Sequence, residues 1–204
     1  MTNGDSFKIR MALPKDARAI LEIYAPYVRD TAITLTSKMP TVDMIRKKMH
    51  LVKKNFPYLV CTVNDKVVGF AFADRDRPHE ACCWNAELSI YLDAGFHGRG
   101  MAKALYTALF QILKAQGFCN LYAVITVPNE ASIALHKRFG FNELAIHRGV
   151  GYKLGQWRDV LWMLCRIEGT DPEVHGPPTP LKKLRNNEID TALMMATALL
   201  VGSR

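Results

Sequence analysis

The sequence predicts an α+β protein in which helices cover a mixed sheet of about six to seven strands. Short apolar runs typical of strands alternate with longer segments whose apolar residues recur at helical spacing. These segments follow one another in the order β-α-α-β-β-β-α-β-α-β-β, which places helices on the faces of one sheet. With 204 residues, the chain has the size of one ordinary domain with an appendage.

The first half of the chain is expected to contain four strands and two helices. Pro14-Lys15-Asp16 begins the first helix, and Thr41-Val42-Asp43 begins the second. Asn64-Asp65 is a two-residue hairpin turn between two strands. The expected elements are a strand at 7–10, a helix from residue 14 to about 28, a helix at 41–52, and strands at 58–64, 66–73 and 86–92.

The second half is expected to continue with two helices and three strands. Gly117 supplies the C-terminal cap of the first helix, and Pro128-Asn129 begins the second. The expected elements are a helix at 102–116, a strand at 121–127, a helix from 129 to about 139, and strands at about 144–152 and 158–167.

The composition changes after residue 169, which divides the chain into a domain at 1–169 and an extension at 170–204. Thr170 to Pro180 contains four prolines and one glycine, a composition typical of a linker. Residues 181–201 carry apolar residues that predict one or two helices able to cover a sheet edge, dock on a second subunit or fray.

The composition restricts the classes of partner. No apolar run approaches the roughly 20 residues of a membrane span, and no secretory signal is visible, so we expect a cytoplasmic protein without a membrane partner. The net charge of +8 would suit either nucleic acid or an anionic cofactor. Because no aromatic residues interleave the basic cluster at 46–54, we expect a solvated helix face there and no nucleic-acid partner. The five cysteines have no framework spacing, so we expect free thiols and no metal.

A glycine-rich turn between a strand and a helix is the most informative feature of the sequence. It spans His97-Gly98-Arg99-Gly100-Met101-Ala102, directly after the strand that ends in Tyr91-Leu92. Glycine permits positive φ and close approach to a ligand, and the following helix start offers unpaired N–H groups. The turn therefore predicts a cradle for a pyrophosphate.

This turn and its surroundings resemble the GNAT superfamily of N-acetyltransferases. The family pattern of Gln or Arg, two residues, Gly, one residue, and Gly or Ala falls on residues 97–102, with His97 at its first position. The ordered set Glu87, Leu105-Tyr106-Thr107, Pro128-Asn129, Gly140-Phe141 and Gly155-Gln156-Trp157 is closest to the phosphinothricin and methionine-sulfoximine acetyltransferase branch. The resemblance covers about residues 7–167 and implies the GNAT fold, acetyl-CoA as co-substrate, and often a homodimer.

The resemblance also implies which residues bind the donor and catalyse transfer. Glu87 matches the general base that removes a proton from the acceptor amine; the alternative is a strand residue that faces solvent. His136 matches a catalytic or oxyanion residue, or else is a hydrogen-bonded core histidine. The implied cofactor contacts are Ser89, Ile90, Tyr91, Leu92, His97, Gly98, Arg99, Gly100, Met101, Ala102 and Asn129. Asn129 would equally serve as a helix N-cap.

The acceptor site departs from the branch at several positions. Leu35 stands where a phenylalanine is usual, and Cys82 and Cys83 replace an aromatic pair. Arg77 and His79 are candidates to bind an acceptor carboxylate, or else are exposed loop charges. Lys153 and Trp157 match a segment that closes over the pocket in this branch.

Three functions are open from the sequence. The first is acetyl-CoA-dependent acetylation of the α-amine of a small amino-acid-like molecule, by direct attack in a ternary complex. The second is acetylation of a protein or peptide, which requires an open groove. The third is a non-catalytic acyl-CoA-binding module whose tail docks a partner; the presence of Glu87, Asn129 and His136 argues against it.

Overall fold

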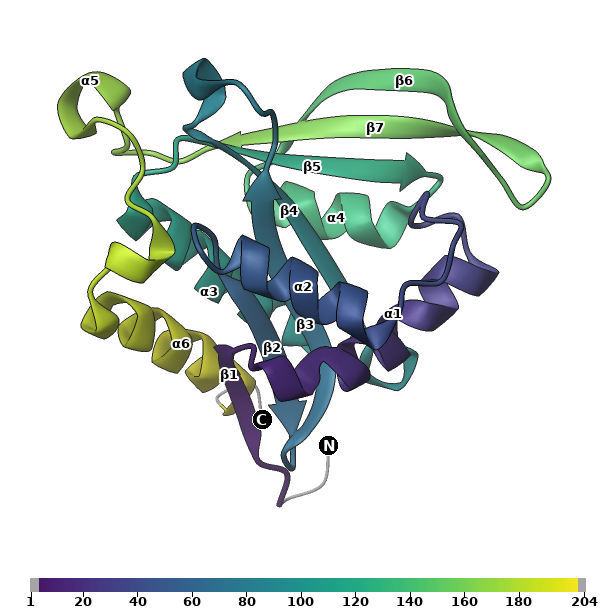
Figure 1. The fold of residues 1–204 in the computed structure, drawn as a ribbon, viewed down its shortest axis with the longest axis horizontal. Helices are drawn as coiled ribbons and strands as arrows, with labels where there is room; N and C mark the ends of the chain where they lie inside the picture. The colour runs from purple at the N-terminus through teal and green to yellow at the C-terminus, as the bar shows by residue number, and fades with distance from the viewer. Residues whose placement is uncertain (1–3, 202–204) are drawn as a thin grey trace.

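The computed structural model describes residues 4–201, without the side chains of residues 174 and 175. One sheet of seven strands runs through the molecule in the order β1-β2-β3-β4-β5-β7-β6 (Figure 1). Neighbouring strands are antiparallel except for β4 and β5, which are parallel. The strands are β1 (Phe7–Met11), β2 (Tyr58–Val63), β3 (Lys66–Arg75), β4 (Asn85–Leu92), β5 (Asn120–Val127), β6 (Asn142–Lys153) and β7 (Gln156–Arg166).

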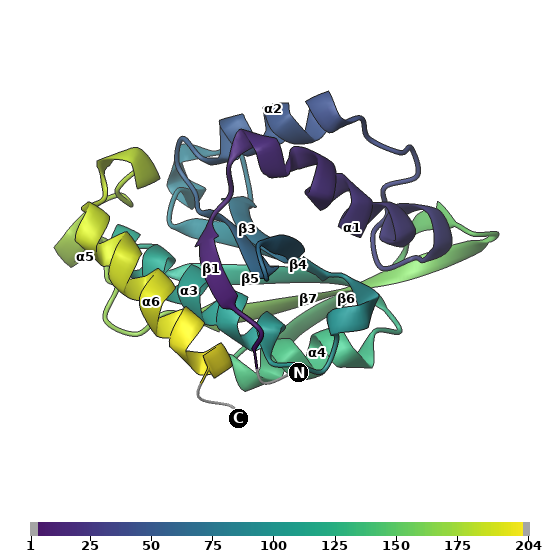
Figure 2. The same ribbon diagram turned by 90° about the horizontal axis from the view of Figure 1, so that it is seen from below.

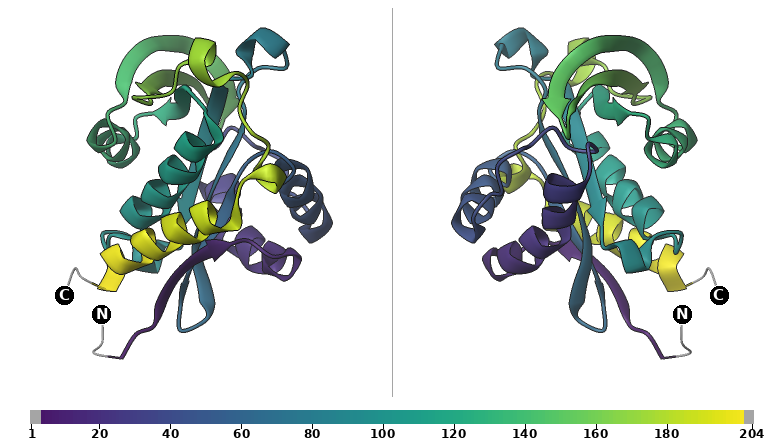
Figure 3. Two further views of the ribbon diagram at one scale, coloured as in Figure 1. Left: turned by 90° about the vertical axis from the view of Figure 1, so that its left-hand side faces the viewer. Right: turned by 90° about the vertical axis from the view of Figure 1, so that its right-hand side faces the viewer.

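Helices cover both faces of this sheet, which confirms the predicted α+β class. Helices α1 and α2 lie on one face, and α3, α4 and α6 lie on the other (Figures 2 and 3). Within residues 4–201, none of the helices has the length and apolar character that a membrane crossing requires. The helices are α1 (Ala17–Asp30), α2 (Val42–Val52), α3 (Met101–Gln116), α4 (Glu130–Arg138), α5 (Pro172–His175) and α6 (Asn186–Val201).

Local sequence accounts for the ends of these elements. Asn64 and Asp65 both have positive φ, 49° and 64°, as a two-residue hairpin between β2 and β3 requires. The Thr41 side chain accepts a hydrogen bond from the backbone N–H of Met44 and so caps α2. Gly117 ends α3 in the left-handed conformation, with φ 89°.

An aromatic cluster fixes α1 against the sheet. The Tyr58 ring stacks on Phe72 with centroids 4.8 Å apart, and Phe70 stacks on Tyr91 at 5.2 Å. Tyr24 of α1 meets the Tyr91 ring edge-on at 4.8 Å. Each such pair adds about 0.5–1.5 kcal/mol beyond the burial of its area. The cluster therefore holds β3 and β4 rigidly beneath α1.

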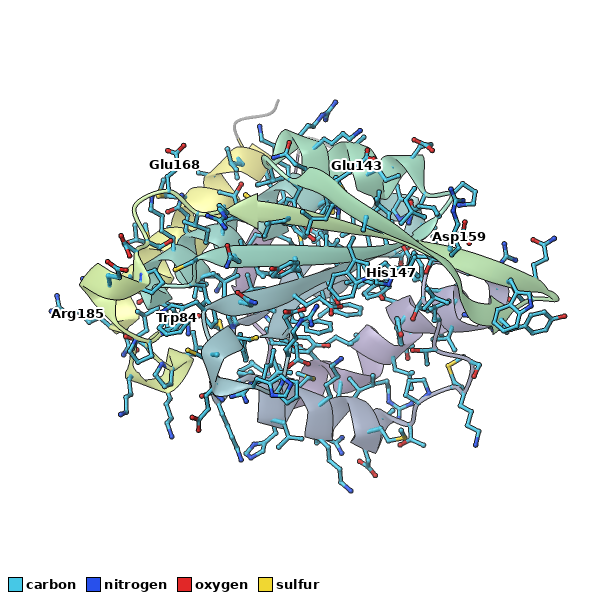
Figure 4. All side chains as sticks on the ribbon, turned by 90° about the horizontal axis from the view of Figure 1, so that it is seen from above. Trp84, Glu143, His147, Asp159, Glu168 and Arg185 are labelled. Carbon is cyan, nitrogen blue, oxygen red and sulfur yellow. The ribbon has the colours of Figure 1, made fainter. Side chains whose placement is uncertain are left out.

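The proline-rich segment 170–180 is more ordered than its composition predicts. It contains the short helix α5, and its far end is held by the side chain of Gln116, whose Nε2 donates to the carbonyl of Thr179 at 2.8 Å. The indole N–H of Trp84 donates to the carbonyl of Gly176 at 2.8 Å, and Trp84 lies beside this segment in Figure 4. Hydrogen bonds from distant residues thus fix a segment that we predicted to be an irregular linker.

Helix α6 covers the edge of the sheet formed by β1. The backbone N–H of Ile9, which has no strand partner on that side, donates to Thr197 Oγ1 at 3.0 Å. Ala192, Ala196 and Leu200 of α6 are buried in the same core as β1 and α3. Of the three expectations for the extension, the structure confirms the covering of a sheet edge.

We expect Leu200→Ala to lower the free energy of unfolding by about 2–5 kcal/mol, because the side chain is 2% exposed and its loss leaves a cavity. Met194→Ala removes a side chain of the same helix that is 73% exposed and should change stability by less than about 0.5 kcal/mol. Urea unfolding measures both values. Equal effects would contradict the packing of α6 on the core.

Candidate active site

The paired part of β4 and β5 is short, and the strands separate beyond it. They pair at Asn85↔Asn120, Ala86↔Leu121 and Glu87↔Tyr122 only, whereas β4 continues to Leu92 and β5 to Val127. A cavity of about 60 Å³ lies in the opening between the diverging strands. Its lining includes Ser89, Ile90, Tyr91, Asn129, His136 and Tyr106. The opening leaves backbone groups of both strands free to bind a ligand.

The glycine turn lies at the end of β4, just before α3. Gly98 and Gly100 have φ of 72° and 80°, which favours glycine at both positions. A Cβ at Gly98 would meet no atom within 4 Å, so this backbone is open to an approaching group. Helix α3 begins at Met101, and its first N–H groups have no partner within the helix. The turn therefore has the open backbone and the unpaired N–H groups that an anion cradle requires, and its role in binding stays a prediction.

The side chains around this cradle have different roles. His97 Nε2 lies 3.1 Å from the Tyr27 hydroxyl and 3.3 Å from the Leu92 carbonyl, so its ring fastens the turn to β4. The Met101 side chain is buried in the core, which leaves its backbone for binding. The Arg99 side chain is exposed, with its guanidinium 5.1 Å from the centre of the Phe96 ring.

Glu87 is the last paired residue before the strands separate. Its register partners are Asp74 on β3 and Tyr122 on β5, whose side chains share its face of the sheet. The side chain is half-buried. Burial raises the pKa of the Glu87 carboxyl above its ordinary value; the charges of Asp76 and Asp74 raise it further, and Lys48 opposes them. A carboxylate with a raised pKa beside an opening is suited to accept a proton.

Asn129 and His136 lie on the other wall of the opening. The Asn129 side chain accepts a hydrogen bond from the N–H of Ser132 at 3.2 Å, which confirms its N-cap role in α4. His136 is 3% exposed, and its Nδ1 lies 2.7 Å from the Ser132 carbonyl, an acceptor only. Nδ1 therefore carries the proton, and Nε2 accepts from the Tyr106 hydroxyl at 2.7 Å. This geometry favours a hydrogen-bonded core histidine at the floor of the cavity.

Leu35 and Lys153 join two segments near the opening. The Leu35 side chain packs against Gly151 of β6 so closely that a Cβ there would lie 2.9 Å from it. Lys153 is 7% exposed, and its ammonium donates to the backbone carbonyl of Thr34 at 2.7 Å. These contacts fasten the loop after α1 to the β6–β7 hairpin.

The other predicted acceptor residues, Arg77, His79 and Trp157, are exposed and do not line this cavity. Trp157 lies near the tip of the hairpin, is 68% exposed and contacts the Tyr152 ring at 5.5 Å. Arg77 and His79 are exposed in the segment after β3, where Arg77 Nε lies 3.5 Å from Asp76 Oδ2. Within residues 4–201, no cluster of three or more His, Cys, Asp or Glu residues could hold a metal ion.

Sequence reasoning missed two residues near Glu87. Tyr122 shares its face of the sheet, and the Tyr122 ring meets the Trp162 ring edge-on at 6.1 Å. Asp76 was not singled out from the sequence, yet its side chain is 1% exposed. The alternation of Asp74 and Asp76 at the end of β3 was the available signal, because such spacing places both on one face.

Comparison with known proteins places this architecture in a family. The model of the acetyltransferase (GNAT) domain matches residues 9–162. A phosphinothricin N-acetyltransferase of Streptomyces coelicolor is 33% identical over 159 residues, which cover 76% of this chain and 93% of the relative. An L-methionine sulfoximine/L-methionine sulfone acetyltransferase of Pseudomonas aeruginosa is 31% identical, covering 81% of this chain and 97% of the relative.

A solved structure gives the same result. The phosphinothricin acetyltransferase of Sinorhizobium meliloti, in complex with acetyl-CoA, superposes with a TM-score of 0.78 at 29% identity, covering 87% of this chain and 95% of the other. The chain belongs to the GNAT acetyltransferase family. It is an enzyme of the N-acetyltransferase class, and the extension from residue 170 lies outside the part that the family model matches.

We expect the neutral His136 imidazole to persist to a lower pH than that of a free histidine, with its proton on Nδ1, because burial lowers its pKa. Long-range ¹H–¹⁵N NMR correlations identify the tautomer. The unfolded chain in urea should titrate near 6.5. Because the unfolded state then binds the proton more readily, His136 should make stability fall as pH drops below about 6.5. Protonation of His136 in the folded protein at a higher pH than in the unfolded chain would contradict this arrangement.

Proposed function

We propose that this protein transfers the acetyl group of acetyl-CoA to the α-amine of a small amino-acid-like acceptor of the phosphinothricin or methionine sulfoximine type. The observation that carries the proposal is the position of Glu87. Glu87 is the last residue at which β4 and β5 pair. Its carboxylate therefore borders the opening between the two strands, on the face of the sheet that α1 covers. The named acceptors of the curated relatives supply the substrate class.

The residues present fit acetyl-CoA. The turn at residues 98–100 and the first N–H groups of α3 would hold its pyrophosphate, since both offer backbone donors and a positive helix end. Unpaired backbone groups of Ser89, Ile90 and Tyr91, together with Asn129, would hold the pantetheine arm between β4 and β5. When bound, the thioester supplies an acetyl group activated for attack by an amine.

The proposed mechanism is direct transfer within a ternary complex. Glu87 removes one proton from the acceptor's ammonium, directly or through a water molecule, and frees a nitrogen lone pair. That nitrogen attacks the acetyl carbonyl, and the C–S bond breaks as the amide forms. Backbone N–H groups of β4 stabilise the developing negative charge on oxygen. The nitrogen gives up its second proton as the intermediate collapses, and the leaving thiolate of coenzyme A takes up that proton, directly or through water.

The acceptor would lie on the α1 side of the sheet. Leu35 and the buried Lys153 form a fixed wall there, since the loop after α1 is fastened to β6. Arg77 and His79 are exposed near Glu87 in the chain and would be free to contact an acceptor carboxylate. Trp157 would contact an acceptor only through movement of the hairpin or through a second subunit, because it is exposed near the hairpin tip.

Release of coenzyme A, followed with a thiol reagent, tests the proposed function. The acceptor panel contains phosphinothricin, methionine sulfoximine, methionine sulfone, free amino acids and short peptides. Turnover on one small amino-acid analogue supports the proposal. Turnover on peptides alone would instead establish protein or peptide acetylation. Binding of acetyl-CoA without turnover on any acceptor would indicate a non-catalytic acyl-CoA-binding module.

We expect Glu87→Gln to lower kcat about 10²–10⁴-fold, because the amide cannot accept the amine proton. The wild-type rate should fall as pH drops through the pKa of Glu87, which lies above the ordinary value for a glutamate, because the reaction needs the ionised form. The control is Glu143→Gln, an exposed glutamate of β6 paired with Lys137 at 2.7 Å (Figure 4). Full activity of Glu87→Gln would refute the base assignment.

We also propose that the protein is a homodimer and acts in the cytoplasm. Strand β6 forms the free edge of the sheet, and its exposed side chains include Leu144, Ile146 and Val150. Such an apolar edge offers both unpaired backbone groups and apolar surface to a second copy. All five cysteines are free thiols, as is common in a reducing compartment.

Light scattering after size exclusion tests the dimer. The wild type should have twice the chain mass, and Ile146→Lys should shift it to the monomer, because a lysine on the edge strand opposes pairing. Leu51→Lys introduces the same charge at an exposed apolar residue of α2 and should leave the dimer intact. A wild-type monomer at micromolar concentration would overturn the proposal.

A further inference from the structure

A row of polar side chains crosses the sheet at Asn85, two residues before Glu87 in β4. Asn120 Nδ2 on β5 donates to Asn85 Oδ1 on β4 at 3.0 Å. Asn85 Nδ2 in turn donates to Asp76 Oδ2, just after β3, at 3.4 Å. Because Asn85 precedes Glu87 by two residues in the same strand, this row and Glu87 lie on the same face of the sheet. The row places the Asp76 carboxylate diagonally beside Glu87.

One oxygen of Asp76 is left without a hydrogen bond. Oδ2 has two neighbours, Asn85 Nδ2 and, at 3.5 Å, Arg77 Nε. Oδ1 is buried and finds no donor anywhere in the chain between residues 4 and 201. The whole side chain is 1% exposed, so solvent does not replace the missing donor. A buried carboxylate oxygen without a donor costs about 1–3 kcal/mol or more, so Oδ1 is a strong acceptor for any donor that comes within reach.

We propose that Asp76 is a positioning residue for the general base: Asp76 Oδ1 accepts a hydrogen bond from Glu87 once Glu87 has taken the proton of the acceptor amine. This inference rests on the proposed role of Glu87. The ionised Glu87 carboxylate has no proton to donate and repels Asp76. The protonated carboxyl has one O–H, and Oδ1 is a strong, buried acceptor for it.

The charges that face Glu87 support this arrangement. Asp76 is the neighbouring charge that most raises the pKa of Glu87, ahead of Asp74, while Lys48 of α2 lowers it. Lys48 lies 4.0 Å from Asp74 and above the Phe72 ring, so its charge is shared with that aspartate. The charged and titratable groups around Glu87 and Asp76 include Lys48, Asp74, Arg77, Tyr91, Tyr122 and, across Trp162, His147, with Tyr106 of α3 on the other face of the sheet.

The proton balance of the step is complete. The acceptor's ammonium loses one proton to Glu87, the N–H bond breaks and an O–H bond forms on Glu87. That O–H is directed to Asp76 while the nitrogen attacks the thioester. The proton leaves to solvent when Glu87 ionises again, and the second proton of the nitrogen goes to the thiolate of coenzyme A as the C–S bond breaks. Asp76 thereby strengthens Glu87 as a base without touching the acceptor or the donor.

The pH dependence of kcat tests the inference. Asp76→Asn should shift the acid limb of the profile to lower pH, because loss of the negative charge makes Glu87 easier to ionise. The weaker base should also lower kcat on the plateau by up to about tenfold, with little change in KM. Lys48→Met should shift the same limb in the opposite direction. If Asp76→Asn does not fold, Asp76→Ser is measured in its place, because it also removes the charge.

Asn85→Ala tests whether the effect on Glu87 comes from the charge of Asp76 or from the hydrogen-bonded row of side chains. It breaks the hydrogen bond to Oδ2 and keeps the carboxylate, so the acid limb should stay at its wild-type position. Equal shifts in Asn85→Ala and Asp76→Asn would overturn the inference, since they would reflect a structural role.

Glu87→Gln, measured in parallel, keeps the two proposals distinguishable. If this variant retains turnover, Glu87 is not the base and both proposals fail. If it loses turnover while the Asp76 variants keep the wild-type acid limb, only the inference about Asp76 fails.

Discussion

The parallel pairing between β4 and β5 covers three residue pairs and then stops, although both strands continue. Two properties of the site depend on this interruption. Beyond Glu87, the backbone N–H and C=O groups that would pair with each other in a complete ladder remain available to a ligand. Glu87 belongs to the last residue pair before the opening. Strands on both sides therefore hold it, and its side chain still borders the opening. A fully paired sheet would have neither this opening nor a carboxylate held rigidly beside it.

The two edges of the sheet differ in whether another element of the chain covers them. At β1 the edge is closed, because Thr197 of α6 bonds the free N–H of Ile9 and the helix fills the space beside α3. At β6 the edge is open and apolar, and the hairpin that carries it is fastened through Lys153 to the loop beside the acceptor region. A contact made along β6 would therefore act on the loop after α1, which we propose as a wall of the acceptor pocket.

The order of the elements could be predicted because apolar periodicity and capping residues are local properties, and the strand and helix bounds of the domain agree within about three residues. Glu87 and the glycine turn could be predicted because their motifs are contiguous. The fixed path of residues 176–180 could not, since it depends on Gln116 and Trp84 from other parts of the chain. Asp76 was missed for a similar reason: burial, which depends on packing, distinguishes it from the exposed charges around it.

The contact between α6 and β1 joins residues that are 188 positions apart in the chain. During synthesis the first strand leaves the ribosome early, whereas the helix that covers it is made long afterwards. Until then, β1 has one bare edge, and its pairing with β2 must hold it in place. The same helix brings Leu200 to 4.0 Å from the position of a Cβ at Gly100, so α6 also borders the glycine turn. The last helix of the chain thus contacts both its first strand and this turn, through contacts of high sequence separation that form late in folding.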